Sequence, residues 1–316
     1  MQEVSAILAD LFTTLPATWI AVVFVFSLLV GSFLNVVIHR LPIMLEREWT
    51  TQAREILAGN GDHAAAADAG DTAREQPPPY NLIVPRSACP HCGAAITAWQ
   101  NIPVISYLWL KGRCASCGAR ISPRYPIVEL GTAILSALVA WKFGYHWYTA
   151  AALVLTWSLI ALSAIDIDHQ LLPDNITLPL VWLGLLLSLA PPVAQIGLPV
   201  DTRSSIIGAV AGYVGLWSVY QLYKLATRKE GMGYGDFKLF AAFGAWLGWQ
   251  MLPLIILLSA FTGATIGLAS IALRGRDKNI PMSFGPYLAA AGWIALMWGD
   301  ELVGSYLRLS GIDAGR

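Results

Sequence analysis

Long apolar stretches dominate this chain and restrict the folds open to it. Of its 316 residues, 56% are hydrophobic and only 13% are charged, well outside the average of soluble proteins. A helix that crosses a bilayer needs about 20 mostly apolar residues, because no backbone amide can stay unpaired in hydrocarbon. The sequence therefore predicts an all-α polytopic membrane protein with about eight transmembrane helices, near residues 17–38, 127–143, 148–165, 175–191, 205–226, 237–250, 253–273 and 283–299.

Lysine and arginine are concentrated in alternate connections between these predicted spans. Sixteen of the 20 lie between the first two spans, around the loop after the fifth, or after the seventh. With eight spans these regions share one side of the membrane, and basic loops stay preferentially on the cytoplasmic side. We therefore expect that side to be the cytoplasm. The formal net charge is zero, so no overall field favours nucleic acid as a partner.

The longest connection divides the chain into three expected parts. A first transmembrane segment, 1–38, leads into a cytoplasmic loop domain, 39–126, and a membrane-embedded domain, 127–316, follows. Within the loop domain, residues from about 58 to 79 are small, polar and end in prolines. They offer too little apolar surface to pack, so we expect a flexible insert there.

All four cysteines lie in the loop domain, in two C-x-x-C motifs separated by 21 residues and each followed by glycine. Each motif can present two thiolates at tetrahedral angles, and the glycine permits a tight turn. The pattern predicts a structural zinc site formed by Cys89, Cys92, Cys114 and Cys117, with His91 as a spacer. Disulfides and a redox dithiol are the alternatives. A reducing cytoplasm disfavours the first, and no βαβ pattern supports the second.

Two acidic clusters lie at the expected cytoplasmic ends of spans. One contains Asp166, Asp168 and Asp174 after the third span, and the other is Asp236 in a G-x-G-D motif before the sixth. Carboxylates brought close together share a proton, so one can serve as base and the other as acid toward a water that attacks a peptide carbonyl. Helix capping and solvation at the interface also explain single aspartates. The residues alone leave open which member of the first cluster pairs with Asp236.

Two further features concern packing. Lys238, two residues beyond Asp236 on a helix, is expected to point away from it and to snorkel or to face phospholipid. Three spans carry glycines four residues apart, a spacing that lets helix backbones approach closely. These pairs are Gly208 with Gly212, Gly244 with Gly248, and Gly263 with Gly267.

Six segments together resemble the prepilin leader peptidase/N-methyltransferase family, the bacterial type IV prepilin peptidases. The match runs from about residue 17 to 300, and the insert near 58–79 falls outside it. The segments are GSFLNVVIHRLP at 31–42, the four-cysteine loop, RYPIVEL at 124–130, the D-x-D-H-x-x-L-P-D motif at 166–174, GMGYGD at 231–236 and FGPY at 284–287.

The resemblance implies two successive reactions. Such enzymes cut the short basic leader of type IV prepilins and type II secretion pseudopilins after a glycine, at the cytoplasmic face of the bacterial inner membrane. They then methylate the new amino terminus, usually phenylalanine, with S-adenosylmethionine. Carried over by motif position, the catalytic pair is Asp166 and Asp236. Gly112 matches a position linked to methyl transfer and is the expected cofactor-binding residue, on the resemblance only.

Two other functions remain open at this stage. A different G-x-G-D intramembrane protease would need neither the four-cysteine loop nor the basic amino-terminal half of the chain. A non-enzymatic, zinc-bearing membrane scaffold would leave the two acidic clusters unexplained.

Overall fold

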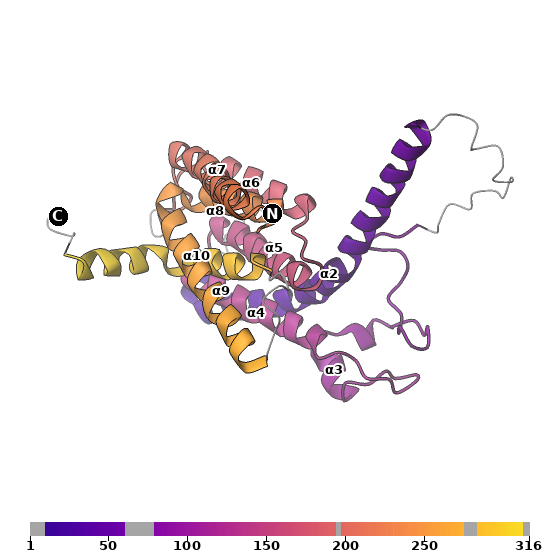
Figure 1. Cartoon of the computed structure of the whole chain (residues 1–316). Coiled ribbons are helices and arrows are strands. Elements are labelled where there is room, and N and C mark those ends of the chain that lie inside the picture. Colours follow the sequence, from indigo (N-terminus) through magenta and orange to yellow (C-terminus); the bar gives the residue numbers. More distant parts are fainter. Residues whose placement is uncertain (1–9, 61–78, 194–196, 230, 275–282, 312–316) are drawn as a thin grey trace.

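Helices account for nearly all regular structure in a computed structural model that describes residues 10–60, 79–193, 197–229, 231–274 and 283–311 (Figure 1). Within these ranges the only β-pairing is three isolated antiparallel bridges. The expected all-α fold is confirmed. The longer helices are α2 (Pro16–Asn60), α4 (Arg124–Phe143), α5 (Trp147–His169), α6 (Asp174–Leu187), α7 (Thr202–Thr227), α8 (Tyr234–Leu247), α9 (Leu252–Arg274) and α10 (Gly285–Leu309), and the short ones are η1 (Trp99–Asn101), α3 (Ile105–Trp109) and η2 (Trp249–Met251).

Each of the eight predicted spans falls on one of the longer helices. Five of them, α2, α4, α5, α7 and the helical segment containing α9, are long and apolar enough to cross a bilayer. Helix α6 is apolar but shorter. A polytopic membrane protein is therefore confirmed, while the number of spans stays a prediction.

Helix α2 is much longer than the first predicted span. It continues through Pro42 to Asn60, and its second half extends beyond the bundle on the side that carries α3 (Figure 1). The first part of the expected loop domain is thus helical, because helix formers follow Pro42 and the helix continues past that proline. The beginning of the expected insert is also helix. Residues 61–78, most of that insert, lie outside the described residues.

Helix α8 forms the centre of the bundle and packs against α6, α7 and α10. Its side chains are buried on every face, including Phe237, Phe243 and Trp246. A helix that is apolar all round belongs in a core. The Trp246 indole N–H donates to the carbonyl of Leu180 at 2.8 Å, which ties α8 to α6.

The glycine spacings bring α7 and α8 into backbone contact. A Cβ added to Gly208 would lie 2.2 Å from the Gly244 carbonyl oxygen, and one added to Gly212 would lie 2.7 Å from the Phe240 carbonyl oxygen. No side chain fits between these backbones, so the packing expected from the small-residue spacing is confirmed for this helix pair.

The cysteine-bearing segment is attached to α2 and α4 by buried polar groups. Arg40 on α2 is buried and donates to the carbonyls of Asn81 at 2.9 Å and Pro85 at 2.6 Å. Glu129 on α4 is also buried, and its Oε2 accepts the backbone N–H of Val104 at 2.8 Å. These bonds place the segment against the helices that start the membrane-embedded part.

Candidate active site and metal centre

Asp166 and Asp236 come from different helices and meet in the interior. Asp166 lies in the last turn of α5 and Asp236 in the first turn of α8. Only 5% of Asp166 and 6% of Asp236 is exposed, and Leu172 lies against both Gly285, which contacts Asp166, and Gly235, which precedes Asp236. The fold therefore joins one member of the first acidic cluster to the G-x-G-D aspartate. We call these two residues the carboxylate pair.

The start of α10 completes the surroundings of Asp166. The Gly285 backbone N–H donates to Asp166 Oδ2 at 3.0 Å, and the Ser283 hydroxyl donates to the Asp166 carbonyl oxygen at 3.0 Å. A Cβ added to Gly285 would lie 2.6 Å from Asp166 Oδ2. A side chain at this position would collide with the carboxylate. The FGPY segment thus has a role at the site that sequence reasoning did not identify, although the resemblance had singled it out.

Leu172 packs against the backbone next to both carboxylates. A Cβ on Gly235 would lie 2.5 Å from Leu172 Cβ, and one on Gly285 would lie 3.1 Å from Leu172 Cδ2. The second glycine of the G-x-G-D motif is therefore required by close packing. Asp236 Oδ1 is buried and has no hydrogen-bond partner among the described residues. A buried acceptor without a protein partner is costly unless a water molecule, an ion or a substrate group binds it.

The other aspartates of the first cluster have basic partners instead. Arg124, at the start of α4, forms an ion pair with Asp168, and it also donates to the Ala164 carbonyl at 3.2 Å. Lys238 binds both oxygens of Asp174, at 2.6 and 2.7 Å. Lys238 therefore points to this carboxylate of α6 and away from Asp236, as its position on the helix predicted. The snorkelling or phospholipid-facing role stays a prediction.

The four cysteines lie in one cluster, with their sulfur atoms all within 4.8 Å of one another. The two C-x-x-C motifs adopt the same turn. The Gly93 N–H donates to the Cys89 carbonyl and the Gly118 N–H to the Cys114 carbonyl, each at 2.9 Å. Both glycines have positive φ, +71° and +72°, a region that favours glycine. We call Cys89, Cys92, Cys114 and Cys117 the cysteine cluster.

The distances in this cluster suit zinc. Four sulfurs at about 2.3 Å from a tetrahedral zinc stand roughly 3.8 Å apart, and Cys89 Sγ lies 3.8 Å from Cys117 Sγ. Backbone N–H groups of Cys117 and Ser116 lower the pKa of the Cys114 thiol to about 6. The matching N–H groups of Cys92 and His91 lower the pKa of Cys89.

Cys117 differs from the first cysteine of each motif. The Ala119 amide lowers the pKa of Cys117, but partial desolvation and the three neighbouring sulfurs together raise it to about 11. Four thiolates repel one another unless a cation lies between them. The cluster as a whole is thus a donor set that requires a metal to become fully ionised.

Gly112 occupies the turn between α3 and the second C-x-x-C motif. Its φ is +66°, and a Cβ there would lie 2.9 Å from the Tyr107 hydroxyl oxygen. The Gly112 N–H donates to the Tyr107 carbonyl at 2.9 Å. Backbone geometry and contact with Tyr107 therefore explain a glycine here. The described residues around it do not define a donor set for S-adenosylmethionine.

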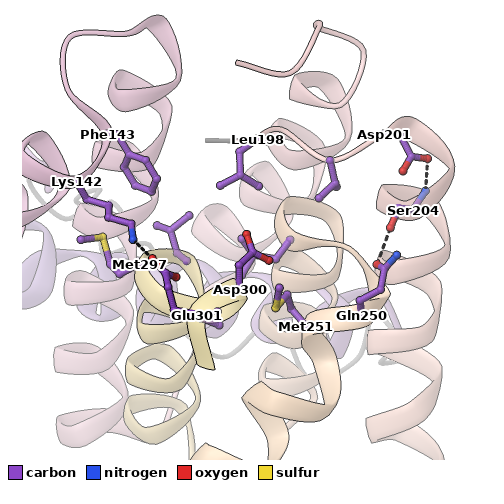
Figure 2. Close-up of a pocket in the computed structure, with 16 residues that line it drawn as sticks. Lys142, Phe143, Leu198, Asp201, Ser204, Gln250, Met251, Met297, Asp300 and Glu301 are labelled. Atoms are coloured by element: carbon purple, nitrogen blue, oxygen red, sulfur yellow. Dashed lines mark hydrogen bonds and ion pairs between the residues drawn. The ribbon is translucent and has the colours of Figure 1, made fainter. Parts of the chain in front are cut away.

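A cavity of about 870 Å³ lies away from the carboxylate pair. Asp236 lies in the first turn of α8, whereas Leu247, which lines the cavity, ends the same helix, about 16 Å farther along at 1.5 Å per residue. The cavity is therefore separate from the candidate active site. Figure 2 shows its polar contacts, which are Lys142 with Glu301, Asp201 with Ser204, and Ser204 with Gln250.

Fold and site together define a helical membrane protein with a buried aspartate pair and a four-cysteine cluster, the class to which membrane aspartyl peptidases with a metal-binding loop belong. Family models agree with both halves. Residues 25–143 match the bacterial peptidase A24 N-terminal domain, and residues 153–268 match the type IV leader peptidase family.

Individual relatives match nearly the whole chain. Proteins named prepilin leader peptidase/N-methyltransferase are 52% identical in Stutzerimonas stutzeri, 54% in Aeromonas hydrophila and 51% in Pseudomonas aeruginosa. The alignments cover 93%, 96% and 96% of this chain and 96%, 98% and 99% of the relatives, in the same order. No solved structure matches the chain. The chain belongs to the prepilin leader peptidase/N-methyltransferase family.

Proposed function

We propose that this chain cleaves the leader peptides of type IV prepilins and type II secretion pseudopilins and then N-methylates the new amino terminus. The observation that carries the peptidase half is the carboxylate pair. Two buried aspartates from separate helices lie together, and neither has an ion-pair partner among the described residues. The relatives' shared name supports both halves of the proposal.

In the proposed peptidase reaction, the carboxylate pair acts on one water molecule. The ionised member takes a proton from the water as its oxygen attacks the scissile carbonyl, and the protonated member donates its proton to the substrate. The peptide bond breaks to give a carboxyl group on the leader and an amine on the mature protein. The Gly285 N–H orients Asp166 through Oδ2, and Asp236 Oδ1 is available to the water.

In the proposed second reaction, S-adenosylmethionine would be the methyl donor for the new amine, and the transfer would release S-adenosylhomocysteine and a proton. Gly112 is our proposed residue for this half, on its motif position. It lies in the segment that Arg40 and Glu129 attach to the helices. That segment lies near the N-terminal end of α4, where Arg124 pairs with Asp168. This placement keeps the segment at the same end of the bundle as the carboxylate pair.

We also propose that the cysteine cluster holds one structural zinc ion. A shell of four sulfurs is closed, so the metal would stabilise the loop and take no part in either reaction.

The proposed location is the bacterial inner membrane. The carboxylate pair and the cysteine cluster would then lie at the cytoplasmic face, as the basic connections suggest. The corresponding domains are a first segment, 1–38, a loop domain, 39–126, and a peptidase domain, 127–316. Phospholipid would surround the exposed apolar side chains of the bundle, such as Phe26 and Leu257.

One assay tests both halves of the proposed function. Purified protein in detergent is incubated with a prepilin and S-adenosylmethionine, and mass spectrometry reads the masses of the products. We expect loss of the leader followed by a gain of one methyl group at the new terminus. Asp236→Asn protein should abolish the first change but still methylate a pilin supplied already cleaved. A wild-type enzyme that leaves the prepilin intact would contradict the proposal.

A further inference from the structure

A second cavity, of about 190 Å³, lies between α9 and the start of α10. Its lining combines small residues on α9 with two aromatic rings at the start of α10. Since one water molecule occupies about 30 Å³ in the liquid, the cavity has room for a large side chain. The residues that line it are Ala260, Gly263, Ala264, Ser283, Phe284 and Tyr287.

This cavity shares a wall with the candidate active site. Ser283 lines it, and the Ser283 hydroxyl donates to the Asp166 carbonyl oxygen. Phe284 also lines it and directly precedes Gly285, whose N–H binds Asp166 Oδ2. The cavity therefore lies against the segment from Ser283 to Gly285 that binds Asp166.

The lining selects the chemistry of the occupant. Among the described residues that line it, the polar side-chain groups are the Ser283 hydroxyl and the Tyr287 phenol, and the other side chains are apolar. This part of the lining suits an apolar side chain better than a charged one. Ala260 and Ala264 are exposed on the outer surface of α9. The cavity is thus open toward lipid, the side from which an apolar segment held in the membrane would arrive.

We propose that this cavity binds the apolar side chain of the first mature residue of the substrate, the residue that follows the cleaved bond. The inference rests on the proposed peptidase function. The cavity extends from Ser283, which binds the Asp166 carbonyl, to Tyr287, about one turn farther along α10. In the proposed orientation this direction leads away from the cytoplasmic face. A basic leader stays in the polar cytoplasmic region, so the chain that continues into the membrane is the mature side of the bond.

Gly263 is the position that controls the volume of this cavity. A Cβ there would lie 3.4 Å from Tyr287 Cδ2, which is ordinary contact, so alanine fits and leucine fills the space. Leucine is a better helix former than glycine, so the change does not weaken α9. Ala264→Leu reduces the same volume from the neighbouring position. Leu268→Phe is the matched control, because this side chain on the same helix is 69% exposed and does not line the cavity.

The test is a competition between two prepilins that differ only at the first mature residue, phenylalanine in one and alanine in the other. Both are present in one reaction, and mass spectrometry gives the ratio of the cleaved products, which does not depend on the amount of active enzyme. We expect wild type and Leu268→Phe to favour phenylalanine. Gly263→Leu and Ala264→Leu should each reduce that preference by about tenfold or more, the usual scale for steric discrimination in an apolar pocket.

Each alternative result has a distinct meaning. An unchanged product ratio in both leucine variants would overturn the pocket assignment and leave the proposed peptidase function standing. A second pair of prepilins, which differ only at the residue before the cleaved bond, tests the leader side. If the two leucine variants change the product ratio of this second pair and not of the first, the cavity serves the leader side and the assignment is wrong. Failure of the wild-type enzyme to cleave either prepilin would overturn the proposed function together with the pocket.

Discussion

Lys238 binds both carboxylate oxygens of Asp174, although Asp236 lies only two residues before it in the same helix. Arg124 similarly pairs with Asp168, two residues after Asp166. Lys238 and Arg124 are thus bound to acids that neighbour the carboxylate pair in the sequence or in the fold. Asp166 and Asp236 are buried and have no cationic partner among the described residues. Asp168 and Asp174 are not buried, and each has one.

This contrast predicts different effects for the four aspartate-to-asparagine variants. Asp166→Asn and Asp236→Asn should each lower kcat/KM for cleavage by about 10²–10⁴-fold or more, because neither carboxylate activates water alone. Asp168→Asn and Asp174→Asn each remove a partly exposed ion pair, worth up to about 1 kcal/mol. We therefore expect kcat/KM for cleavage to fall by less than about tenfold in these two variants. Initial rates on a prepilin would measure all four. Near-normal cleavage by Asp166→Asn would remove it from the pair and direct attention to Asp168 or Asp174.

Gly285→Ala should impair cleavage with little effect on stability. The new methyl group would lie 2.6 Å from Asp166 Oδ2, and the carboxylate must rotate away because it is the more flexible partner. We expect cleavage to fall by about 10- to 100-fold, since small displacements of a catalytic group are costly. Gly215→Ala is the control, because nothing lies within 4 Å of its added Cβ. If Gly285→Ala and Gly215→Ala cleave at comparable rates, the close approach of residue 285 to Asp166 Oδ2 does not matter for cleavage.

Purified protein should contain about one zinc ion per chain, measured by elemental mass spectrometry. Cys114→Ser should lower the zinc content and expose residues 39–126 to limited proteolysis, because a structural metal contributes its binding free energy to folding. Ser116→Ala is the matched control, since it lies within the same C-x-x-C motif and removes no sulfur. Complete loss of zinc without any change in proteolysis or in either activity would show that the metal has no structural role.

The proposed orientation predicts the behaviour of two reporter fusions. A reporter fused after Glu75 should read as cytoplasmic and one fused after Val193 as periplasmic, because the basic connections stay inside. Paired enzymatic reporters that are active on opposite sides of the inner membrane would measure both. The reverse pattern would move the carboxylate pair to the periplasmic face and remove the basis for a cytoplasmic peptidase.

Features set by local spacing were predictable from the sequence. The glycines four residues apart predicted a close approach of helix backbones, although not which helices, and the structure has it between α7 and α8. The two C-x-x-C motifs predicted that four sulfurs would meet. Each rests on a short segment whose geometry follows from its own residues. The presence of zinc and the catalytic roles of Asp166 and Asp236 stay predictions.

Contacts between distant segments were not predictable in the same way. The bond from Gly285 to Asp166 joins residues of α10 and α5, and the pairing of Lys238 with Asp174 joins α8 and α6. Neither segment alone specifies its partner, because tertiary packing decides it. The length of α2 was missed for another reason. Hydropathy ends a span where charged residues begin, but those residues continue a helix equally well.

The continuous α2 helix has a mechanical consequence for the part of the protein outside the membrane. Its backbone touches α4 at Gly31, where an added Cβ would lie 2.7 Å from Glu129 Cα, and the helix then runs about 44 Å farther to Asn60. A rotation of about 5° around that contact carries the tip roughly 4 Å. Arg40, which binds the cysteine-bearing segment, lies only about 14 Å from the same contact, so that rotation moves the segment by about 1 Å. The far end of α2 can therefore swing while the cysteine-bearing segment keeps its place beside α4.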